Sequence, residues 1–494
     1  MRWELDWLEN RARLSPNKAA IIDDKTKETW TYEELNARAS NTAANLQNMG
    51  VKKGDRVALL APNHICYFDL LFACGKIGAI FVPLNWRLSV HEINEILQDC
   101  TPILIGVHEQ FIQIYDQLPE EKPHAFMVGG SNYSEINFLQ KVEGISETDP
   151  LAMIYTGGTT GKPKGVVLSH RSILWNGINS ILSWGLTDQD VTVNYMPMFH
   201  TGGLNALSIP ILMMGGTVVI GDHFDAAEAV ESINRYHCTI ILLVPTMYHM
   251  LIQSEEFKSS HFPSMKIFLS GAAPCPLQIY EAFQTKGLAF KEGYGLTEAG
   301  PNNFYISPQE AQIKRGSVGK PMMFNSIILE KTDGREAAAN EVGELLIRGK
   351  HAFSFYWNNE QATNETMTEG WIRTGDLAKR DEQGYYYIVG RKKDMIITGG
   401  ENIYPLEIEH WLAEHPAIEE AAVIGLPEEK WGEVVAAFIV FKEWSITDDE
   451  LKTYCEAKLG RYKIPKKFIQ VNELPKTHVG KIDKKKLKEM AIKI

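Results

Sequence analysis

The sequence predicts an α/β fold with more than one domain, and three observations support this. Short apolar runs typical of buried strands alternate with helical stretches, a pattern that implies parallel sheets covered by helices. At 494 residues the chain is too long for one ordinary core, so two or three domains are expected. From about residue 317 the pattern changes to short strands with turn signals, which indicates a smaller β-rich subdomain.

The expected elements follow in chain order. Thr31 and Glu34 form a capping box that opens a helix ending near Gly50. Strands are expected at 56–60, 79–83, 103–107, 191–196, 217–220, 239–244, 265–269, 326–330 and 344–348, and helices at 67–75, 90–97, 203–214 and 226–236. A last strand at 384–390 would close a large N-terminal domain of two β-α-layered subdomains plus the β-rich subdomain, residues 1–390. Beyond it the composition shifts, because residues 458–494 hold twelve Lys and Arg against three Asp and Glu.

Composition narrows the functional classes. The formal charge of -12 and the pI near 5.7 argue against a nucleic-acid binder. The six cysteines lack CxxC spacing, so neither a zinc site nor a disulfide framework is indicated. The N-terminus has acidic residues where a signal peptide needs an apolar core, and the apolar stretch 204–220 is broken by Pro and Gly. A cytoplasmic protein is therefore expected, with peripheral membrane contact left open.

The most informative stretch runs from Tyr155 to Gly165, between two apolar runs. It holds three threonines, four glycines and two lysines in eleven residues. Glycines let backbone N–H groups turn towards an anion, hydroxyls add donors and lysines add charge, so the stretch predicts a loop that binds a triphosphate. The Walker A loop is the nearest alternative, but Pro163 follows Lys162 where that motif needs Ser or Thr.

At these residues the sequence resembles the adenylate-forming superfamily of acyl- and aryl-CoA synthetases, peptide-synthetase adenylation domains and beetle luciferase. The resemblance covers essentially the full length and looks most like bacterial fatty acyl-CoA synthetases. It implies that ATP, with Mg²⁺, converts a carboxylate into an acyl-AMP, which CoA then opens to an acyl-CoA. The chemical reason is that oxide is a very poor leaving group and AMP is a good one. One departure is Gly157, where many relatives have Ser.

Further stretches match family motifs and carry the implied nucleotide site. The stretch 293–298 resembles the YGxTE motif, with Tyr294 facing adenine, Thr297 contacting the α-phosphate and Glu298 as an oxygen ligand for Mg²⁺. The stretch 270–274 resembles the adenine-side loop, and Asp376, expected in a tight turn, would bind the ribose hydroxyls with Arg391. The implied ATP and AMP site comprises Thr156, Gly157, Gly158, Thr159, Thr160, Gly161, Lys162, Lys164, Gly271, Ala272, Ala273, Gly293, Tyr294, Gly295, Thr297, Asp376 and Arg391, and Thr156 joins Glu298 as a metal ligand.

The resemblance also implies that residues 395–494 form a small mobile α+β domain that rotates between the two half-reactions. Its hinge would be residues 391–394, with Lys393 as the hinge residue. Lys481 matches the adenylation lysine, which holds the carboxylate and the α-phosphate together; otherwise it would be one more surface lysine of a basic tail. The implied CoA channel is lined by Gly399, Gly400, Glu401 and Trp431.

The acyl pocket is expected around an aromatic-His segment. His200 would lie between this pocket and the CoA channel, and it joins Lys481, Thr297 and Glu298 as an expected catalytic residue. Phe199, Gly202, Gly203 and Ala299 are the expected pocket residues, and the small ones would leave room for a chain. Neither 195–205 nor 293–305 contains Lys or Arg, so a neutral tail such as a medium- or long-chain fatty acid is favoured over a dicarboxylate, which would need a buried cation.

Several alternatives stay open. An aryl- or o-succinylbenzoate-CoA ligase is the second candidate, and an adenylation enzyme that loads a carrier protein is the third. A silent relative that senses AMP or acyl-CoA belongs to a different class, and the presence of Glu298, Asp376, Arg391 and Lys481 argues against it. The sequence leaves open the particular acid, the oligomeric state, the pathway and the resting orientation of the domains.

Overall fold

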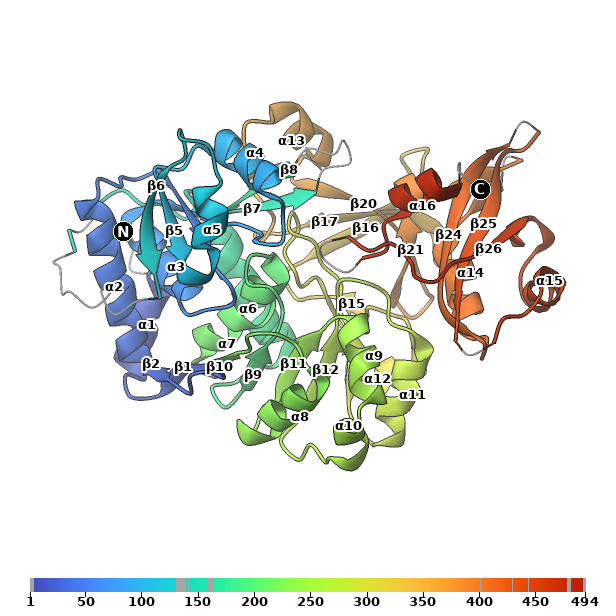
Figure 1. Ribbon diagram of the computed structural model, residues 1–494, viewed down its shortest axis with the longest axis horizontal. Helices are drawn as coiled ribbons and strands as arrows, with labels where there is room; N and C mark the ends of the chain where they lie inside the picture. Colours follow the sequence, from blue (N-terminus) through green and yellow to red (C-terminus); the bar gives the residue numbers. More distant parts are fainter. Residues whose placement is uncertain are drawn as a thin grey trace.

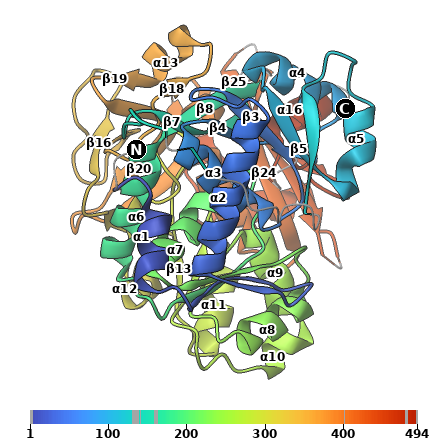
Figure 2. The ribbon, with the colours of Figure 1, turned by 90° about the vertical axis from the view of Figure 1, so that its left-hand side faces the viewer.

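The computed structural model describes residues 4–129, 139–140, 142–157, 163–399, 401–428, 430–442, 444–477 and 481–491. The chain forms a large N-terminal lobe and a smaller C-terminal lobe that lies against one end of it (Figure 1). The turned view in Figure 2 shows helix α2 (Tyr32–Asn48) in the foreground of the N-terminal lobe. The predicted fold class, α/β with a β-rich subdomain and a small C-terminal domain, is confirmed.

The first layered subdomain is built around a mostly parallel sheet. Its elements are α1 (Trp7–Leu14), α2 (Tyr32–Asn48), β3 (Arg56–Leu60), α3 (Cys66–Ile77), β4 (Ile80–Pro83), α4 (Val90–Cys100), β5 (Leu104–His108), α5 (Ile112–Asp116), β6 (His124–Val128), β7 (Pro150–Gly157), β8 (Pro163–Ser169), α6 (His170–Trp184) and β18 (Phe355–Tyr356). Within the described residues the strand order is β18-β8-β7-β4-β3-β5-β6. Its central strands are apolar almost throughout because helices cover both faces.

The second layered subdomain contains two smaller sheets. Its elements are β1 (Ala19–Asp23), β2 (Thr29–Thr31), β9 (Val191–Asn194), the π-helix η3 (Gly202–Ala206), α7 (Ser208–Met214), β10 (Thr217–Ile220), α8 (Ala226–Arg235), β11 (Ile240–Leu243), α9 (Pro245–Gln253), α10 (Glu255–Ser259), β12 (Ile267–Ser270), α11 (Leu277–Thr285) and β13 (Phe290–Glu292). One sheet has the order β2-β1-β10-β9, and the other is the parallel set β11-β12-β13. An aromatic core that includes Tyr248, Phe283 and Phe290 packs against β12 and β13.

The β-rich subdomain is antiparallel and lies between the layered subdomains and the C-terminal lobe (Figure 1). Its elements are β14 (Phe304–Tyr305), α12 (Pro308–Ile313), β15 (Lys320–Pro321), β16 (Ser326–Glu330), β17 (Val342–Arg348), α13 (Glu360–Thr366), β19 (Met367–Thr368), β20 (Trp371–Arg380) and β21 (Tyr386–Arg391). The long strand β20 pairs with β17 on one side and with β21 on the other.

The C-terminal lobe begins after the short helical turn η4 (Lys392–Asp394). It contains β22 (Ile396–Thr398), β23 (Glu401–Ile403), α14 (Pro405–Ala413), β24 (Ile418–Glu428), β25 (Gly432–Phe441), α15 (Asp448–Glu456), η5 (Arg461–Lys463), β26 (Lys467–Gln470) and α16 (Lys484–Ala491). Buried residues such as Ile408, Val423 and Ile439 give this lobe a core of its own. In the part of the chain that the structure describes, none of the helices combines the length and apolarity needed to cross a bilayer.

Most of the predicted elements are present. The capping box at Thr31 is formed, and β3, β10 and β16 have the predicted bounds. The helix predicted at 203–214 is divided, because η3 is a π-helix that ends at Ala206 before α7 begins. A π-helical segment of this kind often occurs at a functional site, and this one follows His200 directly.

Candidate active site

The strands β7 and β8 form an antiparallel hairpin that carries the predicted phosphate loop, called the phosphate hairpin below. Thr156 lies opposite Lys164, and Gly157 lies opposite Pro163. Gly158, Thr159, Thr160, Gly161 and Lys162 lie outside the described residues, so their role in binding phosphate stays a prediction. The Lys164 ammonium lies 5.1 Å from the centre of the Tyr356 ring, within the range of a cation–π contact.

The two predicted adenine-side loops leave the same edge of a sheet. Ser270 ends β12 and lies opposite Glu292 at the end of β13, and the Gly293 N–H donates to the Ser270 carbonyl at 2.8 Å. The carboxyl edge of a parallel sheet is where such folds bind ligands. Ala272 has a φ of 71°, a conformation that is rare for a residue with a side chain and that clusters at functional sites.

The buried side chain of Glu292 connects these two loops. Its carboxylate accepts a hydrogen bond from the Cys275 N–H at 2.9 Å and another from the Tyr280 hydroxyl at 2.7 Å. Burial raises the pKa of Glu292 to about 7. The carboxyl group therefore ties the loop before α11 to the strand that leads into the Gly293–Glu298 motif.

The Gly293–Glu298 motif forms a turn that closes on itself. The Asn303 N–H donates to the Tyr294 carbonyl and the Leu296 N–H to the Gly300 carbonyl, both at 3.1 Å. A Cβ at Gly295 would lie 2.1 Å from the Pro301 carbonyl oxygen, so only glycine fits there. Thr297 and Glu298, the predicted phosphate and metal residues, are half-buried at the tip of this turn.

Asp376, Arg391 and Tyr294 meet at the predicted ribose position. Asp376 and Arg391 are cross-strand neighbours on β20 and β21, with the Arg391 Nε 2.7 Å from the Asp376 Oδ1. The Tyr294 hydroxyl donates to the other Asp376 oxygen at 2.5 Å. Burial raises the pKa of Asp376, whereas the Arg391 cation and the Tyr294 hydroxyl act against that rise.

The prediction that Asp376 lies in a tight turn is wrong. Asp376 lies within the long strand β20, in a bulge where Gly375 has a φ of 68° and the pairing with β17 shifts register. The Thr374 hydroxyl donates to the Leu345 carbonyl at 2.7 Å and accepts from the Asp376 N–H at 3.0 Å. The bulge turns the Asp376 carboxylate towards Tyr294, as bulges near functional sites commonly re-aim a side chain.

Glu298 has one described partner for its carboxylate, the Tyr356 hydroxyl, which donates to Oε1 at 2.7 Å. Across the described ranges, no three His, Cys, Asp or Glu side chains converge as a metal cluster would. Mg²⁺ is usually held by one or two carboxylates together with substrate phosphates. A carboxylate at Glu298 with a hydroxyl at Thr156 therefore fits Mg²⁺ that arrives with a nucleotide.

His200 lies against Phe199, with the ring centres 4.5 Å apart. Burial, together with the nearby Arg87 and Lys481 cations, lowers its pKa to about 4. Its Nε2 is buried and has no hydrogen-bond partner among the described residues. His200 is thus a neutral imidazole at pH 7, placed between the aromatic segment and Lys481.

The expected acyl-pocket residues Gly202 and Gly203 differ in how much space surrounds them. Gly202 faces open space, because an added Cβ would meet nothing within 4 Å. The expectation that Gly203 leaves room for a chain is wrong, since the carbonyl oxygen of Pro197 would lie 2.3 Å from its Cβ. Phe199 and Ala299 are buried in the main core. Glycine at 203 therefore allows the backbone of Pro197 to pack closely against it, and it does not open a cavity.

Arg87 is a cation near the aromatic segment that the sequence prediction overlooked. Its guanidinium carbon lies 5.8 Å from the centre of the Phe199 ring and 5.0 Å from that of Trp86. Burial lowers its pKa. The prediction considered only residues 195–205 and 293–305, and Arg87 comes from the loop after β4. Arg87 thus adds a cation beside the aromatic segment, which those two segments do not supply.

Lys481 comes from the C-terminal lobe and reaches the site of the large lobe. Its backbone is fixed by Thr477, whose N–H donates to the Lys481 carbonyl at 2.7 Å. Although part of its side chain stays in contact with solvent, the protein around its ammonium lowers the Lys481 pKa, as does repulsion from Arg391. The Asp376 and Glu298 carboxylates act in the opposite direction. The ammonium is thus close enough to Arg391, Asp376 and Glu298 to interact electrostatically with all three.

The predicted hinge begins at Arg391, and the described CoA candidates lie further along the chain, in the C-terminal lobe. Lys393 is in η4, directly after Arg391 ends β21. The Gly399 N–H donates to the Trp431 carbonyl at 2.9 Å, and a Cβ on Gly399 would lie 2.9 Å from the Trp431 ring. Glu401 and Trp431 are exposed, and Gly400 lies outside the described residues. The role of these residues in binding CoA therefore stays a prediction.

Two groups of site residues were missed by the sequence prediction. Tyr356 holds Glu298, although it follows it by more than fifty positions and no local signal connects them. The pair Asn302 and Asn303, for which the sequence offered no interpretation, is buried and hydrogen-bonded beneath the turn. Asn302 donates to the Ser180 hydroxyl and the Ala206 carbonyl, both at 2.8 Å. Buried amides are usually satisfied in this way, and the only hint was their position after the motif.

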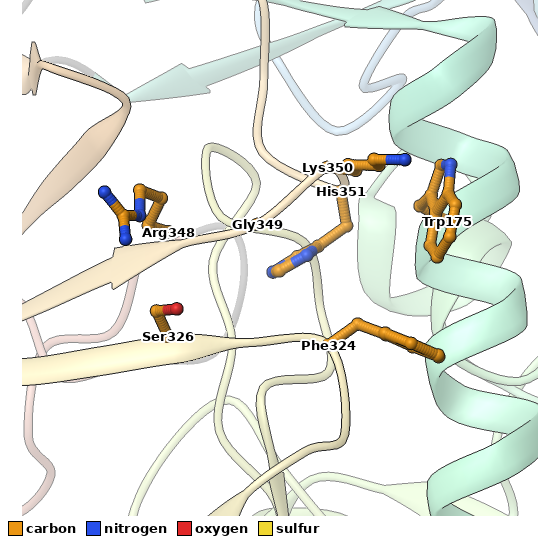
Figure 3. Close-up of a pocket in the computed structure, with 7 residues that line it drawn as sticks. All are labelled: Trp175, Phe324, Ser326, Arg348, Gly349, Lys350 and His351. Carbon is orange, nitrogen blue, oxygen red and sulfur yellow. The ribbon is translucent and has the colours of Figure 1, made fainter.

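A separate cavity of about 290 Å³ lies beside α6 and the end of β17 (Figure 3). In it the Lys350 ammonium lies 4.2 Å from the Trp175 ring centre, and Trp175 meets Phe324 edge-on at 5.3 Å. No described residue predicted for the site lines it. Its buried His351 nevertheless supports the site, because Nε2 lies 3.0 Å from the Asn303 side-chain oxygen. The cavity is lined by Trp175, Phe324, Ser326, Arg348, Gly349, Lys350 and His351.

The predicted nucleotide residues gather at the carboxyl edge of a parallel sheet, and a second lobe adds a lysine, which points to a two-lobed nucleotide enzyme. Residues 8–357 match the family described as AMP-binding enzyme, and residues 407–481 match the AMP-binding enzyme C-terminal domain. The chain therefore belongs to the AMP-binding enzyme family, the acyl-CoA synthetases of the adenylate-forming superfamily.

The similar proteins have names that refer to different acids. The chain is 36% identical to a feruloyl-CoA synthase of Amycolatopsis over 96% of both chains. It is 35% identical to a long-chain-fatty-acid–CoA ligase of Mycobacterium tuberculosis, covering 98% of this chain and 97% of that one. It also resembles the structure of o-succinylbenzoate CoA synthetase from Bacillus subtilis in complex with ATP and magnesium. That similarity has a TM-score of 0.88 and 33% identity, over 97% of this chain and 98% of the other.

Proposed function

We propose that the protein is an ATP-dependent, AMP-forming acid–thiol ligase that converts a carboxylate into its acyl-CoA through an acyl-AMP. The observation that carries this proposal is Lys481, which the C-terminal lobe presents to Asp376, Arg391 and Glu298. Attack of a carboxylate on the α-phosphorus of ATP gathers negative charge on phosphate oxygens, and preorganised cations are what that charge requires.

The site residues take separate roles in this proposal. Asp376 accepts the ribose hydroxyls in a position fixed by Arg391 and Tyr294. The ammonium of Lys481 holds the carboxylate against the α-phosphate, which removes the entropic cost of bringing them together. Thr297 donates to the α-phosphate, and the phosphate hairpin with Lys164 takes the β- and γ-phosphates. Mg²⁺, held by Glu298 and Thr156, would neutralise charge on the phosphates.

We propose a fatty acid of medium or long chain as the substrate, because the segments 195–205 and 293–305 contribute no cation and Gly202 faces open space. An aryl or o-succinylbenzoate-like acid is a second candidate. Arg87, next to Phe199, favours it, since a guanidinium can pair with a second carboxylate. The named relatives, a feruloyl-CoA synthase and a long-chain-fatty-acid–CoA ligase among them, are compatible with either.

The test is a pyrophosphate-release screen over fatty, aromatic, dicarboxylic and amino acids, with and without CoA. Release of AMP and acyl-CoA with one class identifies the substrate, and turnover that needs a carrier protein instead of CoA would point to the third candidate. Absence of AMP with every acid, despite measurable nucleotide binding, would leave a nucleotide sensor. Arg87→Met should lower kcat/KM for dicarboxylates only if the second candidate is correct.

Lys481→Ala tests the proposed role of the second lobe. Adenylate formation should fall by at least about a hundredfold, because a preorganised charge in such a site contributes roughly that much. Release of acyl-CoA from a preformed acyl-adenylate should be largely unchanged. Lys476→Ala is the matched control, since Lys476 lies on the same tail but pairs with Glu420 on its own lobe. Equal loss in both variants would contradict the role.

We also propose that residues 391–394 are the hinge between residues 1–390 and 395–494, and that the second half-reaction needs a rotated lobe. In that orientation Gly399, Gly400, Glu401 and Trp431 would approach the nucleotide site. Lys393→Pro, which fixes φ at the hinge, should spare either adenylate formation or thioester formation. Equal loss of the two half-reactions, measured separately, would count against the hinge.

A further inference from the structure

Tyr356 stands at a junction between the phosphate hairpin and the Gly293–Glu298 turn. Its short strand β18 pairs antiparallel with β8, so that Tyr356 lies opposite Val166. The next residue, Trp357, donates its N–H to the Gly165 carbonyl at 2.8 Å. The tyrosine is therefore fixed by backbone pairing to the strand that leaves the phosphate loop.

From this position the side chain makes two contacts with predicted site residues. Its hydroxyl donates to the Glu298 Oε1 at 2.7 Å, and its ring lies 5.1 Å from the Lys164 ammonium. The Glu298 backbone is held from the same segment, because the Phe353 N–H donates to the Glu298 carbonyl at 2.7 Å. A phenol keeps its proton at neutral pH, so the Tyr356 hydroxyl remains a donor.

We propose that Tyr356 is a positioning residue for adenylation, which sets the orientation of the Glu298 carboxylate and its spacing from Lys164. This inference rests on the proposed function, in which Glu298 holds Mg²⁺ and Lys164 binds phosphate. A phenol that bonds one carboxylate oxygen restricts rotation of the group and leaves the metal one preferred approach. Partners of this kind behind a metal ligand commonly change metal affinity or activity by about 10- to 100-fold when removed.

The experiment compares the Mg²⁺ dependence of acid-dependent pyrophosphate release in the wild type and in Tyr356→Phe. The half-saturating Mg²⁺ concentration should rise roughly tenfold in the variant, with partial recovery of the rate at saturating Mg²⁺. Formation of acyl-CoA from a preformed acyl-adenylate should change less than about twofold, since this step does not need the metal site. Tyr356→Leu, which also removes the ring beside Lys164, should in addition raise the KM for ATP.

Tyr385→Phe is the matched control. Tyr385 is also buried and also donates to a glutamate, Glu310, at 2.5 Å, but neither residue is among the predicted site residues. Loss of the Tyr385 hydroxyl should leave the half-saturating Mg²⁺ concentration unchanged. A merely structural role for Tyr356 would instead lower the melting temperature and depress both half-reactions together, without moving the Mg²⁺ midpoint.

The outcomes separate this inference from the function on which it rests. If the wild type releases no pyrophosphate with any acid, the proposed function fails. If the wild type is active and Tyr356→Phe has the same Mg²⁺ midpoint, the positioning role alone is refuted. A shift of the midpoint in Tyr385→Phe as large as in Tyr356→Phe would refute it as well.

Discussion

Replacing the buried Glu292 with Gln should change how the stability of the large lobe depends on pH. In the folded chain, burial raises the pKa of this carboxyl from its ordinary 4.5 to about 7. The folded state therefore binds a proton that the unfolded chain has already lost between these two pH values. By linkage, the free energy of unfolding must fall as the pH rises from about 4.5 to about 7, because deprotonation favours the unfolded chain.

The size of this effect follows from the two pKa values. Each pKa unit corresponds to about 1.4 kcal/mol, so ionising Glu292 in place costs about 3 kcal/mol of stability at pH 8. Glutamine is nearly isosteric and its amide oxygen can still accept from the Cys275 N–H, but it has no charge to bury. The difference in unfolding free energy, variant minus wild type, should therefore grow by about 3 kcal/mol between pH 4.5 and pH 8.

The assay is urea unfolding of both proteins, followed by tryptophan fluorescence at several pH values, with the large-lobe transition analysed separately from that of the C-terminal lobe. Glu310→Gln is the control, because Glu310 also accepts a tyrosine hydroxyl, yet its partners lower its pKa and its charge is not buried. The difference in unfolding free energy between Glu310→Gln and the wild type should not change over this pH range. A flat difference for Glu292→Gln, within about 0.5 kcal/mol, would refute the reasoning.

Three further predictions concern neighbouring features. Lys291 is buried between Trp184 and Tyr305, 4.7 and 4.8 Å from their ring centres, and burial lowers its pKa to about 7. Lys291→Met should raise the unfolding free energy at pH 7 by on the order of 2–4 kcal/mol. This gain should shrink as the pH rises towards 10.5, where the unfolded chain also loses the proton, and urea unfolding at pH 7 and 10 measures it. Gly203→Ala should cost about 2 kcal/mol or more in the same assay, because its Cβ would meet a backbone carbonyl, whereas Gly202→Ala should be nearly neutral. His200 is neutral above about pH 5 because burial lowers its pKa to about 4. His200→Gln should therefore leave the acid limb of the kcat/KM profile between pH 6 and 8 in place, and loss of that limb would contradict the assignment.

Many of the strands could be predicted because their signals are local. β3, β10 and β16 are short apolar runs bounded by turn residues, and the capping box at Thr31 is a four-residue pattern. For these segments the tertiary structure requires the same conformation that their local sequence preferences favour. The fold class followed from the same signals, since strands alternating with helices leave few architectures.

The candidate site was predictable as a set of motifs but not as a geometry. Asp376 was expected in a turn because Thr-Gly-Asp is a turn-like sequence, whereas pairing with β17 and β21 holds it in a bulged strand. Those partner strands come from elsewhere in the chain, and local preference cannot include them. The same holds for Arg87, which approaches Phe199 from a distant loop, and for Tyr356, whose partner Glu298 belongs to another subdomain.

The charges of the cleft give a physical reason for carrying Lys481 on a separate lobe. Lys481 and Arg391 repel each other, and the protein around Lys481 disfavours its charge, while Asp376 and Glu298 only partly compensate. A bound triphosphate would add several negative charges here and favour the approach of the ammonium, most strongly where water is excluded. In the proposed reaction pyrophosphate then leaves with most of that charge. The attraction that held the lobe in place would weaken at the moment when CoA needs access, so the same electrostatics that favour adenylation would favour the departure of Lys481 afterwards.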